Sequence, residues 1–118
     1  MSEAVELERR FGGIERLYGK GALARLQQSK VAVVGVGGVG SWAAEALVRS
    51  GVGGVRLIDL DVVAESNCNR QIHALSSTLG RAKVEAMAER LADINPSLSC
   101  ELIDDFLTPE NCAALAAG

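Results

Sequence analysis

The sequence predicts an α/β fold with a Rossmann-like parallel sheet and flanking helices. The β-branched run Lys30-Val31-Ala32-Val33-Val34 is typical of a strand that is buried on both faces of such a sheet. A glycine-rich loop follows at 35–40, and SWAAEALVRS at 41–50 is a run of good helix formers that Gly51 ends. A strand, a tight loop and a helix in this order form the first unit of a doubly wound sheet.

The same alternation continues along the chain. Residues 55–59 predict a second strand, which a polar loop at 61–80 follows. Residues 81–94 predict an amphipathic helix, and 98–103 predict a third strand. The order is therefore strand, helix, strand, helix, strand, as expected of parallel pairing.

The last segment predicts one more short helix. Thr108 is expected to be its N-cap, with Pro109 at the first helical position. The chain stops at Gly118, where a fourth strand would be expected, and a three-stranded parallel sheet is narrow. We therefore expect the N-terminal part of a longer protein, truncated after about three strands.

The first part of the chain predicts helices of a different kind. Apolar residues recur at helix-like intervals over 3–28, and the glycines at 12–13, 19 and 21 divide that stretch into short pieces. We expect an N-terminal helical segment at 1–28 and the beginning of a Rossmann-like domain at 29–118.

Composition excludes several classes of function. The 118 residues carry 12 Lys and Arg against 15 Asp and Glu, a net charge of −3 that provides no overall attraction to nucleic acid or to an anionic membrane. No apolar run approaches the roughly 20 residues of a membrane span. Cys68, Cys100 and Cys112 are spaced unlike a disulfide framework or a paired zinc site. We expect a cytoplasmic protein with no membrane contact.

The loop after the first strand contains a G-x-G-x-x-G motif, which predicts phosphate binding. Gly35 permits the tight turn, Gly37 and Gly38 leave room for a phosphate, and Gly40 lets the helix pack closely on the strand. The helix N-terminus then offers free N–H groups and a partial positive charge to the anion.

An aspartate is placed to bind the ribose of the same nucleotide. Asp59 ends the predicted second strand, 19 residues after Gly40, where a carboxylate often accepts hydrogen bonds from ribose hydroxyls. Up to this point a nicotinamide dehydrogenase and an ATP-using enzyme fit equally well.

Two cations favour ATP over NAD. A triphosphate carries about four negative charges and a dinucleotide pyrophosphate about two, so ATP calls for added cations. Arg70 lies in the loop after the second strand, between the amide side chains of Asn69 and Gln71. Lys83 lies in the first turn of the following helix. Both are expected at the carboxyl edge of the sheet, where ligands of this fold bind.

Several spaced motifs resemble one family. GVGGVGSW, the strand ending in IDLD, the loop SNCNRQ and the helix start GRAKVE are together similar to the ThiF/MoeB/HesA family, whose members are related to ubiquitin-activating enzymes. RFGGIERLYG, NRQIHAL and DDFLTP are also similar to the members that dehydrate and cyclise a threonylcarbamoyl group on tRNA.

The resemblance implies an ATP-dependent enzyme that adenylates a carboxylate. It implies Arg70 and Lys83 as catalytic, phosphate-contacting residues, Asp59 as the ribose ligand, and ATP with Mg²⁺ as cofactors. The nucleotide-binding residues that it implies are Gly35, Gly37, Gly38, Gly40, Asp59, Asp61, Asn67, Asn69, Arg70 and Lys83. It makes 29–118 the N-terminal part of an ATP-binding domain. The aspartate that binds magnesium is expected beyond residue 118, so this stretch alone is expected to be inactive.

The resemblance also implies partners. The family forms homodimers and acts on tRNA or on a small sulfur-carrier protein, and the tRNA-modifying members are associated with a cysteine-desulfurase system. Related members carry R-Y-x-R-Q near the N-terminus, and its second arginine reaches the neighbouring subunit's ATP. Here the stretch begins Arg10-Phe11-Gly12-Gly13, so Gly13 replaces that arginine, and Arg10 or Arg16 would have to deputise.

Three alternatives remain open from the sequence. The nearest is a sulfur-carrier adenylyltransferase of molybdopterin or thiamine biosynthesis. The others are an NAD-dependent oxidoreductase and a non-catalytic binding or dimerisation module. Among residues not assigned to chemistry, His73 is predicted to pack within its loop, and Cys100 and Cys112 are predicted to be small core residues.

Overall fold

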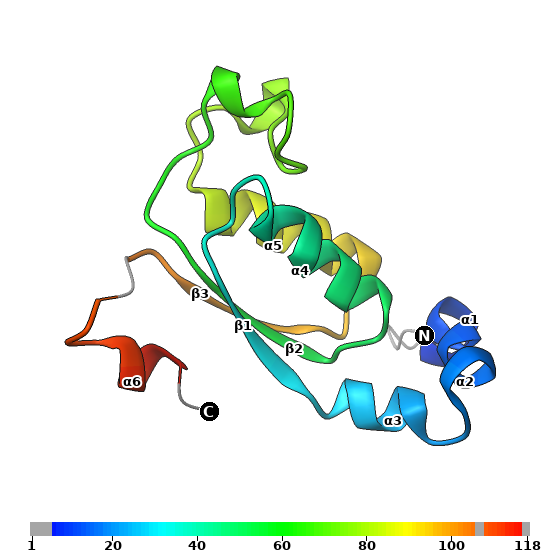
Figure 1. Cartoon of the computed structure of the whole chain (residues 1–118). Helices are drawn as coiled ribbons and strands as arrows, with labels where there is room; N and C mark the ends of the chain where they lie inside the picture. Colours follow the sequence, from blue (N-terminus) through cyan, green and yellow to red (C-terminus); the bar gives the residue numbers. More distant parts are fainter. Residues whose placement is uncertain (1–5, 106–107, 117–118) are drawn as a thin grey trace.

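The sheet has three parallel strands in the order β1-β2-β3 (Figure 1). The computed structural model describes residues 6–105 and 108–116. The strands are β1 (Lys30–Val34), β2 (Gly54–Ile58) and β3 (Ser99–Ile103), each within one residue of the predicted bounds. Their register pairs Val33 with Leu57 and Leu57 with Leu102. The predicted fold class is confirmed.

Two long helices cover one face of the sheet. α4 (Gly40–Arg49) and α5 (Lys83–Ile94) lie side by side on that face (Figure 1). Because both crossovers advance the strand order in the same direction and are right-handed, both helices lie on the same side. Their apolar faces pack on β2, whose Val55 and Leu57 are fully buried in the main core.

The opposite face of the sheet is partly polar in the described residues. Glu101 of β3 forms ion pairs with Lys30 of β1 at 3.0 Å and with Arg56 of β2 at 3.3 Å. Val34, on the same face, is 53% exposed. The prediction that β1 is buried on both faces was wrong, because α4 and α5 both cover the other face. α6 (Cys112–Ala116) lies on this side of the sheet in Figure 1.

The N-terminal segment forms three short helices, as the glycine pattern predicts. They are α1 (Leu7–Phe11), α2 (Gly13–Tyr18) and α3 (Ala22–Gln27). Glu15 joins the last two, because its carboxylate accepts the N–H groups of Gly21 at 3.1 Å and Leu23 at 2.9 Å. Phe11 is buried and lines a pocket with residues at the ends of α4 and α5, so this segment packs on the sheet domain.

The last helix begins later than predicted. α6 starts at Cys112, although Thr108 and Asn111 still exchange hydrogen bonds typical of a helix cap. Thr108 N–H donates to Asn111 Oδ1 at 2.7 Å, and Asn111 N–H donates to Thr108 Oγ1 at 3.3 Å. The prediction that Cys112 is a core residue was wrong. Its side chain is exposed because the main core lies on the other side of the sheet.

The loop between β2 and α5 is compact. It contains two short 3₁₀ helices, η1 (Glu65–Asn67) and η2 (Ser76–Thr78), and it rises over the N-terminal end of α4 in Figure 1. Within the described part of the chain, no helix is long and apolar enough to cross a bilayer.

Candidate nucleotide-binding site

Two positions of the glycine loop at 35–40 favour glycine, the first by its backbone conformation and the second by lack of space. Gly35 has φ +85°, and its N–H donates to the Ile58 carbonyl at 2.8 Å. A Cβ on Gly40 would lie 1.7 Å from the Gly35 carbonyl oxygen. The helix therefore starts in backbone contact with the turn, which is the close approach that the motif predicts.

The loop presents a set of backbone donors with no acceptor. Within the described residues, the N–H groups of Gly37, Gly38, Val39 and Gly40 donate no hydrogen bond, and the next one, Ser41 N–H, donates to the Gly37 carbonyl at 3.0 Å. These groups lie at the N-terminus of the ten-residue helix α4. Free N–H groups and the positive end of a helix dipole together favour an anion.

Asp59 links the glycine loop to the start of the loop that follows β2. One carboxylate oxygen accepts the N–H of Val36 at 2.7 Å, and the other accepts the N–H of Asp61 at 2.8 Å. Each oxygen can still accept a further hydrogen bond, so ribose binding remains open to it. Asp61 has an exposed side chain, and its carbonyl accepts the N–H of Lys83 at 3.0 Å.

Lys83 is a buried cation with no partner. It is the first residue of α5 and only 7% exposed, yet its ammonium makes no hydrogen bond or ion pair with any described residue. The ammonium therefore has no counter-charge among the described residues, and a cation in the first turn opposes the helix dipole. An anion bound beside Lys83 would supply that counter-charge and offset the unfavourable interaction with the dipole. The sequence placed this lysine at the helix start but did not predict that it is buried.

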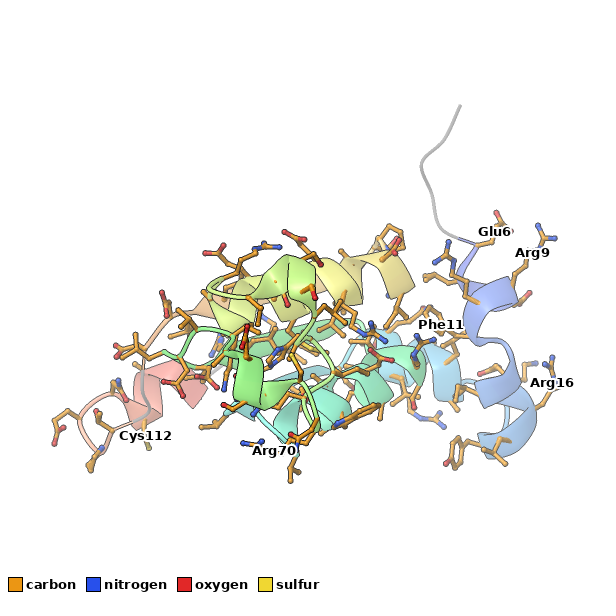
Figure 2. All side chains as sticks on the ribbon, turned by 90° about the horizontal axis from the view of Figure 1, so that it is seen from above. Glu6, Arg9, Phe11, Arg16, Arg70 and Cys112 are labelled. Atoms are coloured by element: carbon orange, nitrogen blue, oxygen red, sulfur yellow. The ribbon has the colours of Figure 1, made fainter. Side chains whose placement is uncertain are left out.

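Arg70 lies beside the glycine loop, and the two asparagines organise the loop around it. The Arg70 side chain passes 3.7 Å from the position of a Cβ on Gly38, and Nη1 donates to the Ser66 carbonyl at 3.0 Å and to Asn69 Oδ1 at 3.1 Å. Figure 2 shows Arg70 at the rim of the molecule. Asn67 Oδ1 accepts the N–H of Ala64 at 2.9 Å, so its side chain shapes the loop.

Three polar side chains near the glycine loop were not among the predicted site residues. Gln71 is 6% exposed, its Nε2 lies 3.7 Å from the position of a Cβ on Gly37, and its Oε1 has no hydrogen-bond partner in the part of the chain that the structure describes. His73 is 1% exposed and contacts the loop backbone, and Trp42 Nε1 donates to the Arg70 carbonyl at 2.8 Å. All three lie within the motifs quoted from the sequence, but only the folded loop brings their side chains to the glycine loop.

Neither N-terminal arginine reaches the glycine loop of its own chain. Arg10 Nη1 donates to the Ile94 carbonyl at 2.8 Å, at the end of α5 opposite to Lys83. Eleven helical steps separate these ends by about 16 Å. Arg16 points away from the molecule in Figure 2. A contact with a neighbouring subunit's nucleotide therefore stays a prediction.

The described residues do not form a magnesium site by themselves. No three His, Cys, Asp or Glu side chains come together within residues 6–105 and 108–116. This stretch alone does not fit the ion, and the expected aspartate beyond residue 118 stays a prediction.

The free donors, the unpaired lysine and the carboxyl edge of a parallel sheet define a Rossmann-like nucleotide-binding protein. Comparison with protein families agrees with this class. The ThiF family model matches residues 11–118, so this chain belongs to the ThiF family. The resemblance seen in the sequence motifs is confirmed.

The individual relatives include proteins with two different named activities. The chain is 51% identical over 111 residues to the tRNA threonylcarbamoyladenosine dehydratase of Haemophilus influenzae, covering 94% of this chain and 42% of that protein. It is 38% identical over 92 residues to the molybdopterin-synthase adenylyltransferase of Escherichia coli, covering 78% and 37%.

A solved structure matches the whole fold. The E. coli tRNA N6-threonylcarbamoyladenosine dehydratase in complex with ATP superposes with a TM-score of 0.91 at 51% identity, covering 97% of this chain and 47% of that chain. The chain therefore spans less than half the length of these relatives.

Proposed function

We propose that this chain is the ATP-binding part of an enzyme that activates a carboxylate by adenylation. The observation that carries the proposal is the combination of four free backbone N–H groups at 37–40 with the ammonium of Lys83, a largely buried residue. Backbone donors alone would suit many phosphates. A cation that has no partner among the described residues calls for a ligand of higher negative charge.

ATP accounts for these residues better than NAD does. The N-terminus of α4 and the loop amides are sufficient for a pyrophosphate with about two negative charges. A triphosphate carries roughly four negative charges, and the two positive charges of Lys83 and the neighbouring Arg70 balance those that the helix N-terminus and the loop amides do not. The ATP complex of the E. coli dehydratase, at 51% identity, supports the same choice.

In the proposed reaction, an oxygen of the substrate carboxylate attacks the α-phosphorus of ATP. The bond from that phosphorus to the bridging oxygen breaks, pyrophosphate leaves, and an acyl adenylate forms. Lys83, Arg70 and the glycine-loop N–H groups stabilise the charge that gathers on the phosphate oxygens. Asp59, held by Val36 and Asp61, accepts a hydrogen bond from the ribose and orients the nucleotide. Magnesium, held by the aspartate expected beyond residue 118, would add charge neutralisation.

We propose that the activated carboxylate belongs to the threonylcarbamoyl group of a modified tRNA. Attack within that group then closes a ring and releases AMP, so that the modification loses one water overall. The higher identity to the dehydratase than to the molybdopterin-synthase adenylyltransferase supports this substrate over a sulfur-carrier protein. A cytoplasmic homodimer and a cysteine-desulfurase partner belong to the same proposal.

The test is pyrophosphate release by the full-length protein with ATP and magnesium. We expect release that depends on tRNA bearing threonylcarbamoyladenosine and that is lost in Lys83→Met. Release with a sulfur-carrier protein in place of tRNA would support the alternative substrate. Absence of release with either substrate, from a protein that is folded by circular dichroism, would overturn the proposed function.

A further inference from the structure

His73 is buried in contact with the backbone of the glycine loop. It is 1% exposed, and its Nε2 lies 2.7 Å from the carbonyl oxygen of Val36. A carbonyl oxygen only accepts, so Nε2 carries the proton and donates. Nδ1 has no hydrogen-bond partner among the described residues. This arrangement belongs to a neutral imidazole held in one tautomer.

The charges around the imidazole agree with a neutral ring. Burial lowers the pKa of His73, the Val36 carbonyl raises it, Lys83 lowers it and Asp59 raises it, with a net decrease. Lys83 comes from α5 and Asp59 follows β2, so these charges reach the ring from both neighbouring elements.

Val36 is held on both sides by side chains from different segments. Its N–H donates to Asp59 Oδ2 at 2.7 Å, and its carbonyl accepts from His73 at 2.7 Å. The residue itself is fully buried. The two peptide planes that flank Val36 are therefore both oriented by side-chain hydrogen bonds.

The orientation of the second plane determines where the first free donor points. The Val36 carbonyl and the Gly37 N–H belong to the same trans peptide, in which the two groups point in opposite directions. A hydrogen bond that draws the carbonyl toward His73 therefore directs the Gly37 N–H away from His73. That N–H is one of the four donors left free. Glycine at 37 makes the opposite orientation sterically accessible, so the peptide needs an external constraint.

We propose that His73 is a positioning residue of the nucleotide site, which holds the Val36–Gly37 peptide so that the Gly37 N–H faces the phosphate. The proposal rests on the proposed ATP site at the glycine loop. Histidine fits this task because Nε2–H donates from the end of a short, rigid ring without adding charge beside Lys83. The role requires one donor at the Nε2 position and no proton transfer.

The test compares three variants of the full-length protein by ATP titration. His73→Gln places an amide N–H near the Nε2 position and should bind ATP within about threefold of wild type. His73→Asn places its amide near the Nδ1 position, too far from the Val36 carbonyl, and His73→Leu has no donor. Both should bind ATP at least tenfold more weakly. Val48→Ala, a buried truncation at the far end of α4, is the matched control for lost stability and should leave ATP affinity unchanged.

Nuclear magnetic resonance without nucleotide supplies a second readout. The Gly37 amide should give one resonance in wild type and His73→Gln, and a broadened or doubled resonance in His73→Leu. Equal ATP affinity of all three variants, or a weakening that Gln and Asn share equally, would overturn the role of His73 while wild-type binding preserves the proposed function. Failure of wild type to bind ATP would overturn the proposed function, and the Gly37 resonance would then decide separately whether His73 holds the peptide.

Discussion

Replacement of Gly40 by alanine tests whether the close approach of α4 to the glycine loop is real. Alanine is the better helix former, and by propensity alone the substitution should stabilise the helix by up to about 1 kcal/mol. The structure predicts the opposite sign. A Cβ at this position would lie 1.7 Å from the Gly35 carbonyl oxygen and 2.9 Å from its carbon.

The size of the effect follows from this geometry. A Cβ contact shorter than 3.0 Å is essentially never seen, so the helix start and the turn must separate by about 3.0 − 1.7 = 1.3 Å. Both sides of the contact are backbone, and no side-chain rotation relieves it. Overpacking typically costs about 1–3 kcal/mol, and a clash that is confined to backbone belongs at the upper end. After the gain in propensity, we expect a net loss of about 2 kcal/mol for Gly40→Ala.

Gly37→Ala is the matched control within the same loop. Its Cβ would meet nothing closer than Gln71 Nε2 at 3.7 Å, which is an ordinary contact. It should therefore fold with wild-type stability or slightly more, yet bind ATP at least tenfold more weakly because the added methyl group blocks the phosphate. Urea unfolding followed by circular dichroism measures the first quantity and ATP titration the second. A Gly40→Ala protein as stable as wild type would refute the close approach.

Three further substitutions test other contacts. Lys83→Met should leave the free energy of unfolding near the wild-type value, because the ammonium has no partner to lose among the described residues, while ATP affinity falls about tenfold or more in a calorimetric titration. Glu45 accepts a hydrogen bond from Arg90, which lowers the pKa of its carboxyl below 4.5. The ionised Glu45 therefore stabilises the folded state fully above that pH, and this contribution is lost as the pH falls through the lowered pKa. In Glu45→Gln, the free energy of unfolding should consequently fall less steeply at acid pH than in the wild type. Asn67→Ala removes the acceptor for Ala64 N–H and should cost about 1 kcal/mol in urea unfolding, whereas an unchanged midpoint would show that Asn67 does not shape the loop.

The bounds of the strands and long helices were predictable from local composition, although the burial of β1 was not, because only Val33 of its five residues is buried. β1 is a continuous apolar run, as strands of parallel sheets are, and its bounds match the prediction at both ends. α5 ends at Ile94, where Asn95 and Pro96 stop it. The predicted start of α6 was too early in the sequence, because Thr108 caps a turn that becomes a regular helix only from Cys112.

The positions of the site residues were predictable, but their environments were not. The motif spacing located the glycine loop, Asp59 and Lys83 at one edge of the sheet. It did not reveal that Lys83 is buried without a partner, or that His73 contacts the carbonyl of Val36. Both features arise where the loop at 61–80 folds over α4, and such tertiary contacts leave no periodic signal in a single sequence.

A calorimetric titration of the full-length protein with ATP and NAD tests the central claim most directly. The account predicts that ATP binds in the presence of magnesium, that Lys83→Met and Asp59→Ala each weaken this binding at least tenfold, and that excess NAD does not compete. Binding of NAD at this site, or ATP binding that neither substitution weakens, would contradict an ATP site formed by the glycine loop, Asp59 and Lys83.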